Sequence, residues 1–214
     1  MKRLRVGLLA SHGGTNMQAI IDACRSGELD AEPRVVISNN SRSGAMERAA
    51  RAGIPAVHLS SVTHPDPQAL DRAMLAVLQQ HGVELVCLAG YMRRLGPLTL
   101  AGYRHRVLNI HPALLPRFGG EGFYGERVHA AVLAAGASES GATVHLVDAR
   151  YDHGPIVAQV RVPVLPGDTV ATLAARVLEQ EHLIYKRTLQ RIASGELDLD
   201  AIAAASAGDP SASV

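Results

Sequence analysis

The first half of the chain alternates short apolar runs with amphipathic stretches, and this alternation limits the folds available to it. Leu4–Ala10 has the pattern of a strand and Thr15–Ser26 that of a helix, and the same order repeats as far as Val107–His111. A β-α-β-α order implies parallel strands joined by right-handed crossovers. We therefore expect an α/β fold, a Rossmann-like and mostly parallel twisted sheet of about seven strands flanked by helices, in a single domain.

The other elements are placed by the same patterns. Strands are expected at Arg34–Ser38, Ala56–Leu59, Leu85–Ala89, Ala142–Val147 and Pro155–Val162, and helices at Ser43–Ala52, Pro67–His81, Pro97–Tyr103, Glu126–Ala135 and Thr169–Ile192. Phe118–Gly125 is a glycine-rich loop with aromatic residues, long enough to serve as a lid or as a wall for a ligand. The tail, 196–214, is rich in Ala, Ser and Asp and is expected to be frayed.

The composition excludes some classes of function. The 214 residues carry a formal net charge of +1, which gives no electrostatic case for binding nucleic acid or an anionic membrane. The apolar runs are too short to span a bilayer. Cys24 and Cys87 are expected to be buried free thiols, which suits a reducing cytoplasm.

Val107–Pro112 carries the strongest chemical signal. Side chains alternate along a strand, so Asn109 and His111 project from the same face, and Pro112 ends the ladder. In open parallel sheets, ligands bind at the carboxyl ends of the strands. An amide and an imidazole held there could bind and protonate a developing oxyanion.

Asp152, in a late loop, is either part of a plain turn or a carboxylate that reaches back to His111. The chain has several other histidines, but none lies at a tight metal-ligand spacing from an acid, so no metal is expected. His145, inside a strand, is expected to be packed or to support the site rather than to react. A serine hydrolase is disfavoured because there is no G-x-S-x-G elbow.

Two further features suggest nucleotide binding, although each has a structural alternative. The turn Ser11–Asn16 contains Gly13 and Gly14, and Thr15 followed by Gln18 matches a capping box. Backbone amides at such a helix start favour a phosphate, but a tight turn alone explains the pattern equally well.

The other feature is an acid on an apolar helix face. Glu181 continues the stripe formed by Val170, Leu173, Val177 and Leu178. A carboxylate there could accept hydrogen bonds from two neighbouring hydroxyls, as on a ribose. On pattern alone, a solvated edge of the stripe is the favoured interpretation.

Together these residues resemble the glycinamide ribonucleotide formyltransferase family, which belongs to the folate-dependent formyltransferase superfamily. The similarity runs from about Leu4 to Ile192. It is carried by Ser11–Gln18, Ser38–Asn40, Leu88–Arg93, Asn109–Pro116, Gly141–His145, Asp152–Pro155 and Gln180–His182. Asn109–Pro112 marks the wider superfamily, whereas the glycine turn and Gln180–His182 narrow the resemblance to this member.

The resemblance implies transfer of the formyl group of 10-formyltetrahydrofolate, as co-substrate, to the amine of glycinamide ribonucleotide (GAR) in purine synthesis. It assigns catalysis to Asn109, His111 and Asp152. It assigns GAR binding to Gly13, Gly14, Thr15, Asn16 and Glu181, and folate binding to Tyr91, Met92, Arg93, Leu95, Val147 and Asp148. It also implies one formyltransferase domain at 1–195, with a nucleotide-binding half at about 1–105 and a folate and catalytic half at about 106–195. A cytoplasmic monomer or homodimer is expected.

The chain departs from the family pattern at three places. His153 follows the proposed catalytic Asp where a small residue is common, so the backbone of that loop is expected to differ from the family pattern. The loop Phe118–Gly125 is longer than usual, and no site residue is assigned in it. Leu178 stands where a polar phosphate contact is often found.

Three alternatives remain open at this point. A related enzyme could formylate methionyl-tRNA or a nucleotide sugar, although a methionyl-tRNA formyltransferase carries a further C-terminal domain. A formyltetrahydrofolate hydrolase would use the same trio with water as the acceptor, and usually has an N-terminal regulatory domain. A nucleotide-binding regulatory module would need the glycine turn but not Asn109, His111 and Asp152.

Overall fold

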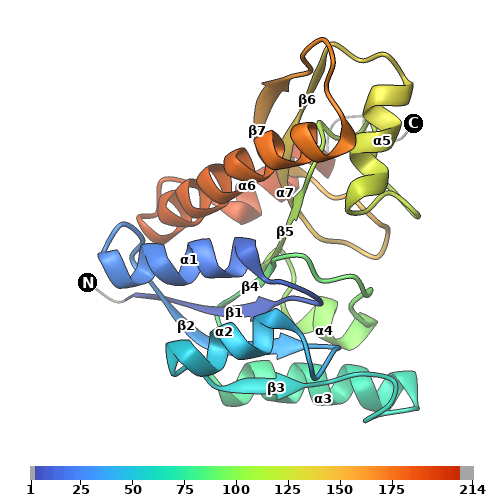
Figure 1. Cartoon of the computed structure of the whole chain (residues 1–214). Coiled ribbons are helices and arrows are strands. Elements are labelled where there is room, and N and C mark those ends of the chain that lie inside the picture. The colour runs from blue at the N-terminus through green and yellow to red at the C-terminus, as the bar shows by residue number, and fades with distance from the viewer. Residues whose placement is uncertain (1–2, 208–214) are drawn as a thin grey trace. The chain divides into compact units, whose positions relative to one another are not determined.

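The computed structural model describes residues 3–207 and confirms an α/β fold built on a mostly parallel sheet of seven strands (Figure 1). The strands are hydrogen-bonded in the order β3-β2-β1-β4-β5-β6-β7. The chain divides into two compact units, one ending at Asn109 and the other beginning at Ile110. Among the described residues, no helix is long and apolar enough to cross a membrane.

The first unit is a parallel sheet with helices between its strands. Its strands are β1 (Leu4–Leu9), β2 (Ala31–Ser38), β3 (Ala56–His58), β4 (Leu85–Leu88) and most of β5 (Val107–His111). Its helices are α1 (Thr15–Ser26), α2 (Gly44–Ala52), α3 (Pro67–Gln80) and α4 (Pro97–Gly102). Residues on β1, β2 and β4 are buried on both faces, which explains their nearly continuous apolar runs. α1 and α2 pack on β2, and α3 packs on α4.

The second unit contains an antiparallel strand pair. β6 (Glu139–Leu146) pairs antiparallel with β7 (Ile156–Pro163), and α6 (Val170–Ala193) packs on both strands. α5 (Glu126–Ala134) packs on α6, and α7 (Leu199–Ala207) contacts β7. The long α6 begins at a capping box, in which Thr169 Oγ1 accepts from the backbone N–H of Thr172 at 3.2 Å.

The start of α1 differs from the expected capping box. The helix begins at Thr15 as predicted, but its N-cap is Gly14, which has φ 71° and makes no side-chain cap bond. A side chain at Gly14 would also meet Ala45, with a Cβ–Cβ distance of 3.0 Å. The turn therefore uses a left-handed glycine where the sequence predicted a side-chain cap, and Thr15 and Gln18 do not form a reciprocal pair.

Two boundaries were also wrong in the sequence analysis. β2 starts at Ala31 rather than at Arg34 and so includes Pro33, and its register with β1 is irregular between Val6 and Gly7. The expected frayed tail contains α7. Asp198 Oδ1 accepts from the N–H groups of Asp200 (2.9 Å) and Ala201 (3.2 Å), and Leu199 is buried. The rest of that predicted tail, 208–214, lies outside the described residues.

Candidate active site

His111 ends β5 and is buried, with 4 % of its surface exposed. Both of its ring nitrogens face oxygen atoms within the second unit. Nδ1 lies 3.4 Å from Oδ2 of Asp152, and Nε2 lies 2.8 Å from the backbone carbonyl of Phe118. Asn109 lies two residues earlier on the same strand, so β-strand alternation directs it to the same face as His111.

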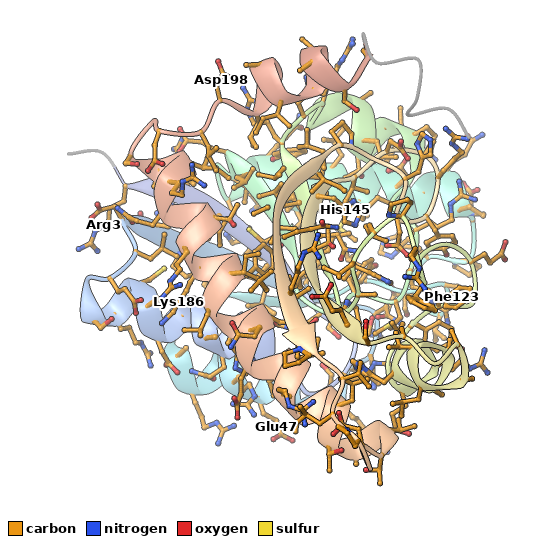
Figure 2. The ribbon with its side chains drawn as sticks, turned by 90° about the horizontal axis from the view of Figure 1, so that it is seen from above. Arg3, Glu47, Phe123, His145, Lys186 and Asp198 are labelled. Carbon is orange, nitrogen blue, oxygen red and sulfur yellow. The ribbon has the colours of Figure 1, made fainter. Side chains whose placement is uncertain are left out.

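The carboxylate of Asp152 contacts three groups. Its Oδ2 faces His111 and accepts from the backbone N–H of Gly120 at 3.0 Å, while its Oδ1 lies 3.5 Å from Nε2 of His145. His145 is on β6 (Figure 2) and its Nδ1 lies 2.8 Å from the carbonyl oxygen of Leu146. Both ring nitrogens of His145 therefore lie against oxygen atoms, one of the Asp152 carboxylate and one of the backbone.

The loop that carries Asp152 is braced from within. Asp152 itself has φ 51°, a left-handed conformation that Asp tolerates. The side chain of Asp148 accepts from the N–H of Arg150 at 2.7 Å and pairs with Nδ1 of His153 at 2.8 Å. A side chain on Gly154 would lie 1.9 Å from the Leu146 carbonyl. His153, the residue that departs from the family pattern, therefore pairs inside the loop while Asp152 turns toward His111.

Burial and hydrogen bonding oppose each other at His111. Its two acceptors are both satisfied only by the imidazolium. Burial nevertheless outweighs the attraction of Asp152 and the Phe118 carbonyl, and it lowers the pKa of His111 below its usual value of 6.5. The pKa of Asp152 is also lowered, because the bonds from His145 and Gly120 and the charge of His111 together outweigh the effect of its burial. The resting pair is thus a neutral imidazole beside a carboxylate.

His129 is a second buried histidine near this pair. It lies on α5 with 5 % of its surface exposed, and its pKa is lowered mainly by burial and secondly by the charge of His111. Among the described residues, its Nδ1 is one of the few buried side-chain atoms without a hydrogen-bond partner. A second positive charge here would be unfavourable whenever His111 is protonated.

In the first unit, the predicted phosphate turn and the predicted folate loop meet at Ser11. Ser11 Oγ donates to Oδ1 of Asn39 at 2.6 Å and accepts from the N–H of Met92 at 2.7 Å. Arg48, on α2, donates from Nε to the Gly13 carbonyl at 2.8 Å. The carboxyl ends of β1, β2 and β4 thus hold the glycine turn next to the segment after β4, as expected for parallel strands.

The other predicted binding residues fall in different environments. Glu181 is only 7 % exposed on α6, so the solvated interpretation favoured by the helical stripe was wrong. Leu95 is buried and Met92 is 39 % exposed, while burial raises the pKa of Tyr91 to about 12. Asn16 is buried, with 9 % of its surface exposed. The remaining residues assigned by resemblance are partly or fully exposed: Gly13, Gly14, Thr15, Arg93, Val147 and Asp148.

Sequence reasoning missed the backbone groups that contact the catalytic candidates. The Phe118 carbonyl and the Gly120 N–H belong to the glycine-rich loop in which no site residue was assigned. The pattern of side chains in a sequence does not predict contacts made by backbone groups. The only sequence signal is the glycines that follow Phe118, and the structure shows the reason for one of them: a Cβ on Gly119 would clash with the side chain of Leu115.

Among residues 3–207, no group of three or more His, Cys, Asp or Glu side chains is arranged to hold a metal ion. The candidate site presents an amide, an imidazole and a carboxylate. Such groups can stabilise an oxyanion and move a proton at a carbonyl carbon.

Comparison with known proteins places these features in one family. Residues 4–189 match the family model described as formyl transferase. Phosphoribosylglycinamide formyltransferase of Escherichia coli is 37% identical over 196 residues, which cover 92% of this chain and 90% of the relative. The chloroplastic phosphoribosylglycinamide formyltransferase of Vigna unguiculata is 39% identical over 90% of this chain, which spans 62% of that relative's length.

A solved structure agrees in fold. Glycinamide ribonucleotide transformylase 1 from Symbiobacterium toebii superposes with a TM-score of 0.86 at 44% identity. The match covers 92% of this chain and 91% of that one. The likeness therefore extends over nearly the whole of both chains.

Proposed function

This chain belongs to the formyl transferase family, and we propose that it transfers the formyl group of 10-formyltetrahydrofolate to the amine of GAR. The products are formyl-GAR and tetrahydrofolate, and the reaction belongs to purine biosynthesis. The similarity to phosphoribosylglycinamide formyltransferases over 90% of the E. coli relative supports this choice of acceptor. The observation that carries the chemistry is the 3.4 Å approach of His111 to Asp152 in a buried site.

In the proposed reaction, the neutral amine attacks the formyl carbon and the carbonyl electrons move to its oxygen. Asn109 donates a hydrogen bond to that oxygen. A fixed amide stabilises the developing charge better than water does, because it does not have to reorient. The attacking nitrogen now carries an excess proton. The tetrahedral intermediate collapses when the folate nitrogen leaves, and that nitrogen must gain a proton.

His111 is suited to carry this proton because its lowered pKa keeps the resting ring neutral near pH 7. It accepts the proton from the attacking nitrogen and becomes an imidazolium, which Asp152 stabilises at 3.4 Å. It then returns the proton to the departing folate nitrogen, directly or through water. The burial of the ring favours a positive charge that appears only during the reaction.

In this proposal the neutral ring carries its proton on Nδ1, toward Asp152, and Nε2 takes up the proton from the substrate. The Phe118 carbonyl lies 2.8 Å from Nε2 and would oppose the unprotonated nitrogen, so it has to move away when substrates bind. The glycine-rich loop 118–125 would then line the bound ligand, and its Phe118 carbonyl would exchange its contact with His111 for one with that ligand. Gly119 and Gly120 give this segment the backbone freedom that such a change needs.

Binding energy is proposed to come from groups remote from the formyl carbon. The N-terminus of α1, with Gly13, Gly14, Thr15 and Asn16, is assigned to the phosphate, because its first N–H groups lack a side-chain cap. Glu181 is assigned to the ribose hydroxyls. The folate is assigned to Tyr91, Met92, Arg93 and Leu95, and to Val147 and Asp148. Holding both substrates converts a bimolecular encounter into an aligned one.

The test is to measure tetrahydrofolate formed from 10-formyltetrahydrofolate with and without GAR. We expect rapid release only when GAR is present, with one formyl-GAR formed for each tetrahydrofolate. Equal release in the absence of GAR would identify a hydrolase. Release that needs methionyl-tRNA or an amino sugar nucleotide would identify a different acceptor, and no release with any acceptor would favour a binding module.

A further inference from the structure

We propose that Gln159 on β7 is a positioning residue for His111, acting through Thr143 and the segment Ala113–Phe118. The inference rests on the proposed function in that it assigns His111 to catalysis. Gln159 lies opposite Thr143 in the antiparallel pair of β6 and β7. Residues that face each other in this way have neighbouring side chains on one face of the sheet.

The amide nitrogen of Gln159 and the hydroxyl of Thr143 use all of their hydrogen-bonding capacity. Gln159 Nε2 donates to the Leu115 carbonyl and to Thr143 Oγ1, both at 2.9 Å. Thr143 Oγ1 also accepts from the Leu115 N–H at 3.2 Å and donates to the Ala113 carbonyl at 2.6 Å. An amide nitrogen has two protons, and a hydroxyl has one proton and two acceptor sites. Every one of these is used.

The segment Ala113–Phe118 starts just after His111 and returns to contact its ring. Ala113 follows His111 by two residues, and three residues beyond Leu115 the chain returns with the Phe118 carbonyl, which contacts Nε2 of His111 at 2.8 Å. Gln159 and Thr143 therefore hold the backbone that leaves His111 and the backbone that comes back to it. The same face of β6 also carries His145, which contacts Asp152 at 3.5 Å.

The chemistry of the pair requires an amide at position 159. A glutamate of the same shape has no donor when ionised, and the oxygen in place of Nε2 would face the Leu115 carbonyl and Thr143 Oγ1 without a proton to share. Gln159 is exposed whereas Thr143 is fully buried, so the carboxylate would turn to solvent and the Leu115 carbonyl would lose its donor. The segment would then shift, and with it the acceptor at Nε2 of His111.

The experiment compares Gln159→Met and Thr143→Val with wild type. Both variants keep side-chain size and remove the hydrogen bonds. We expect kcat to fall about 10- to 100-fold while the KM for GAR changes less than threefold, because misplacement of a catalytic group by about 1 Å has effects of this size. The ring nitrogen chemical shifts of His111, assigned by comparison with His111→Gln, should change in both variants.

Two further variants make the comparison specific. Thr143→Ser keeps the hydroxyl and should restore kcat to within about threefold of wild type. Arg161→Met is the matched control on β7, because it removes a long polar side chain that pairs instead with Glu139 at 2.8 Å on the surface. It should leave both kcat and the His111 signals unchanged. The double variant Thr143→Val, Gln159→Met should lose little more than either single change, because both act through one network.

The inference is overturned if Gln159→Met and Thr143→Val retain wild-type kcat and unchanged His111 signals. It is also overturned if Thr143→Ser is as impaired as Thr143→Val, or if Arg161→Met is equally impaired. If Gln159→Met does not fold, Thr143→Val against Thr143→Ser decides the question. Wild-type protein that forms no tetrahydrofolate would instead refute the proposed function, and the His111 signals would still test the positioning.

Discussion

The carboxylate of Asp152 contacts polar groups from different parts of the second unit. It faces His111 and His145 on two different oxygens and also accepts from the Gly120 N–H. Three favourable partners keep it ionised despite its burial, and its pKa is lowered. Because the negative charge of Asp152 is already in place, no reorganisation is needed when His111 gains a proton. Its removal should therefore affect the reaction more than the fold.

Asp152→Asn is expected to lower kcat by about 10²–10³-fold, the usual loss when one electrostatic group of an active site is removed. The amide keeps the shape of the side chain but cannot stabilise an imidazolium by its charge. Steady-state kinetics with saturating GAR and 10-formyltetrahydrofolate measure the loss, and circular dichroism checks the fold. A folded variant with near-normal turnover would show that this carboxylate has no catalytic role.

The buried histidines predict how stability depends on pH. Burial lowers the pKa of His111 and of His129 below 6.5, so between that lowered value and 6.5 the unfolded chain binds more protons than the folded one. The free energy of unfolding should then rise with pH through this window and level off above about 7.

His129→Gln isolates one of these contributions. Because glutamine does not titrate, the increase in melting temperature between pH 5.5 and 7.5 should be smaller than in wild type. The offset between the two curves should be constant above about pH 7, change in favour of His129→Gln as the pH falls through the window, and become constant again below the lowered pKa. Differential scanning calorimetry at intervals of half a pH unit measures it. Parallel curves across the whole range would contradict this assignment.

At the scale of secondary structure, α7 shows how a weak sequence signal can still place a buried element. Leu199 and Ala203 lie one helical turn apart and are both buried, and Asp198 caps the helix start. The two buried positions stand among Ala and Ser residues, so the segment shows no clear apolar stripe from which a helix could be predicted. The helix contacts β7, the strand that carries Gln159, so α7 is part of the second unit.

Leu199→Ala should lower the free energy of unfolding by about 2–5 kcal/mol, as is usual when a buried leucine is truncated. Urea denaturation followed by circular dichroism gives the value. Leu165→Ala is the matched control, since Leu165 is 48 % exposed and should cost far less. Equal losses for the two variants would mean that α7 does not bury Leu199 in solution.

At the scale of the whole molecule, the fold was predictable because its signal is repeated. Apolar runs at β1, β2 and β4 alternate with amphipathic helices, and each repetition supports the same parallel arrangement. The strands β6 and β7 were expected at nearly their observed positions, but their antiparallel pairing was not predicted. The start of β2 was placed too late, at Arg34, because Glu32 and Pro33 precede the apolar run that the prediction followed.

The candidate site was only partly predictable, for a physical reason. Side chains such as Asn109, His111 and Asp152 are visible in a sequence, and strand alternation relates the first two. The approach of Asp152 to His111 depends on a loop in which Asp152 itself adopts a left-handed conformation, and no periodic pattern encodes it. The backbone groups of Phe118 and Gly120 carry no side-chain signature at all. The burial of Glu181 likewise depends on what packs over α6 rather than on its own stripe.

Ligand binding should stabilise the whole chain, because a ligand that binds only the folded state adds its binding free energy to folding. GAR at 100 times its dissociation constant adds about 2.7 kcal/mol. For a chain of 214 residues, this corresponds to a rise in melting temperature of about 5–10 °C. Asn16→Ala and Glu181→Ala, which remove the proposed phosphate and ribose contacts, should each raise the KM for GAR and abolish most of this rise. A folate analogue should still stabilise both variants, because its assigned residues are unchanged. If both variants keep the full GAR-dependent rise and an unchanged KM, the nucleotide binds through other residues than the glycine turn and Glu181.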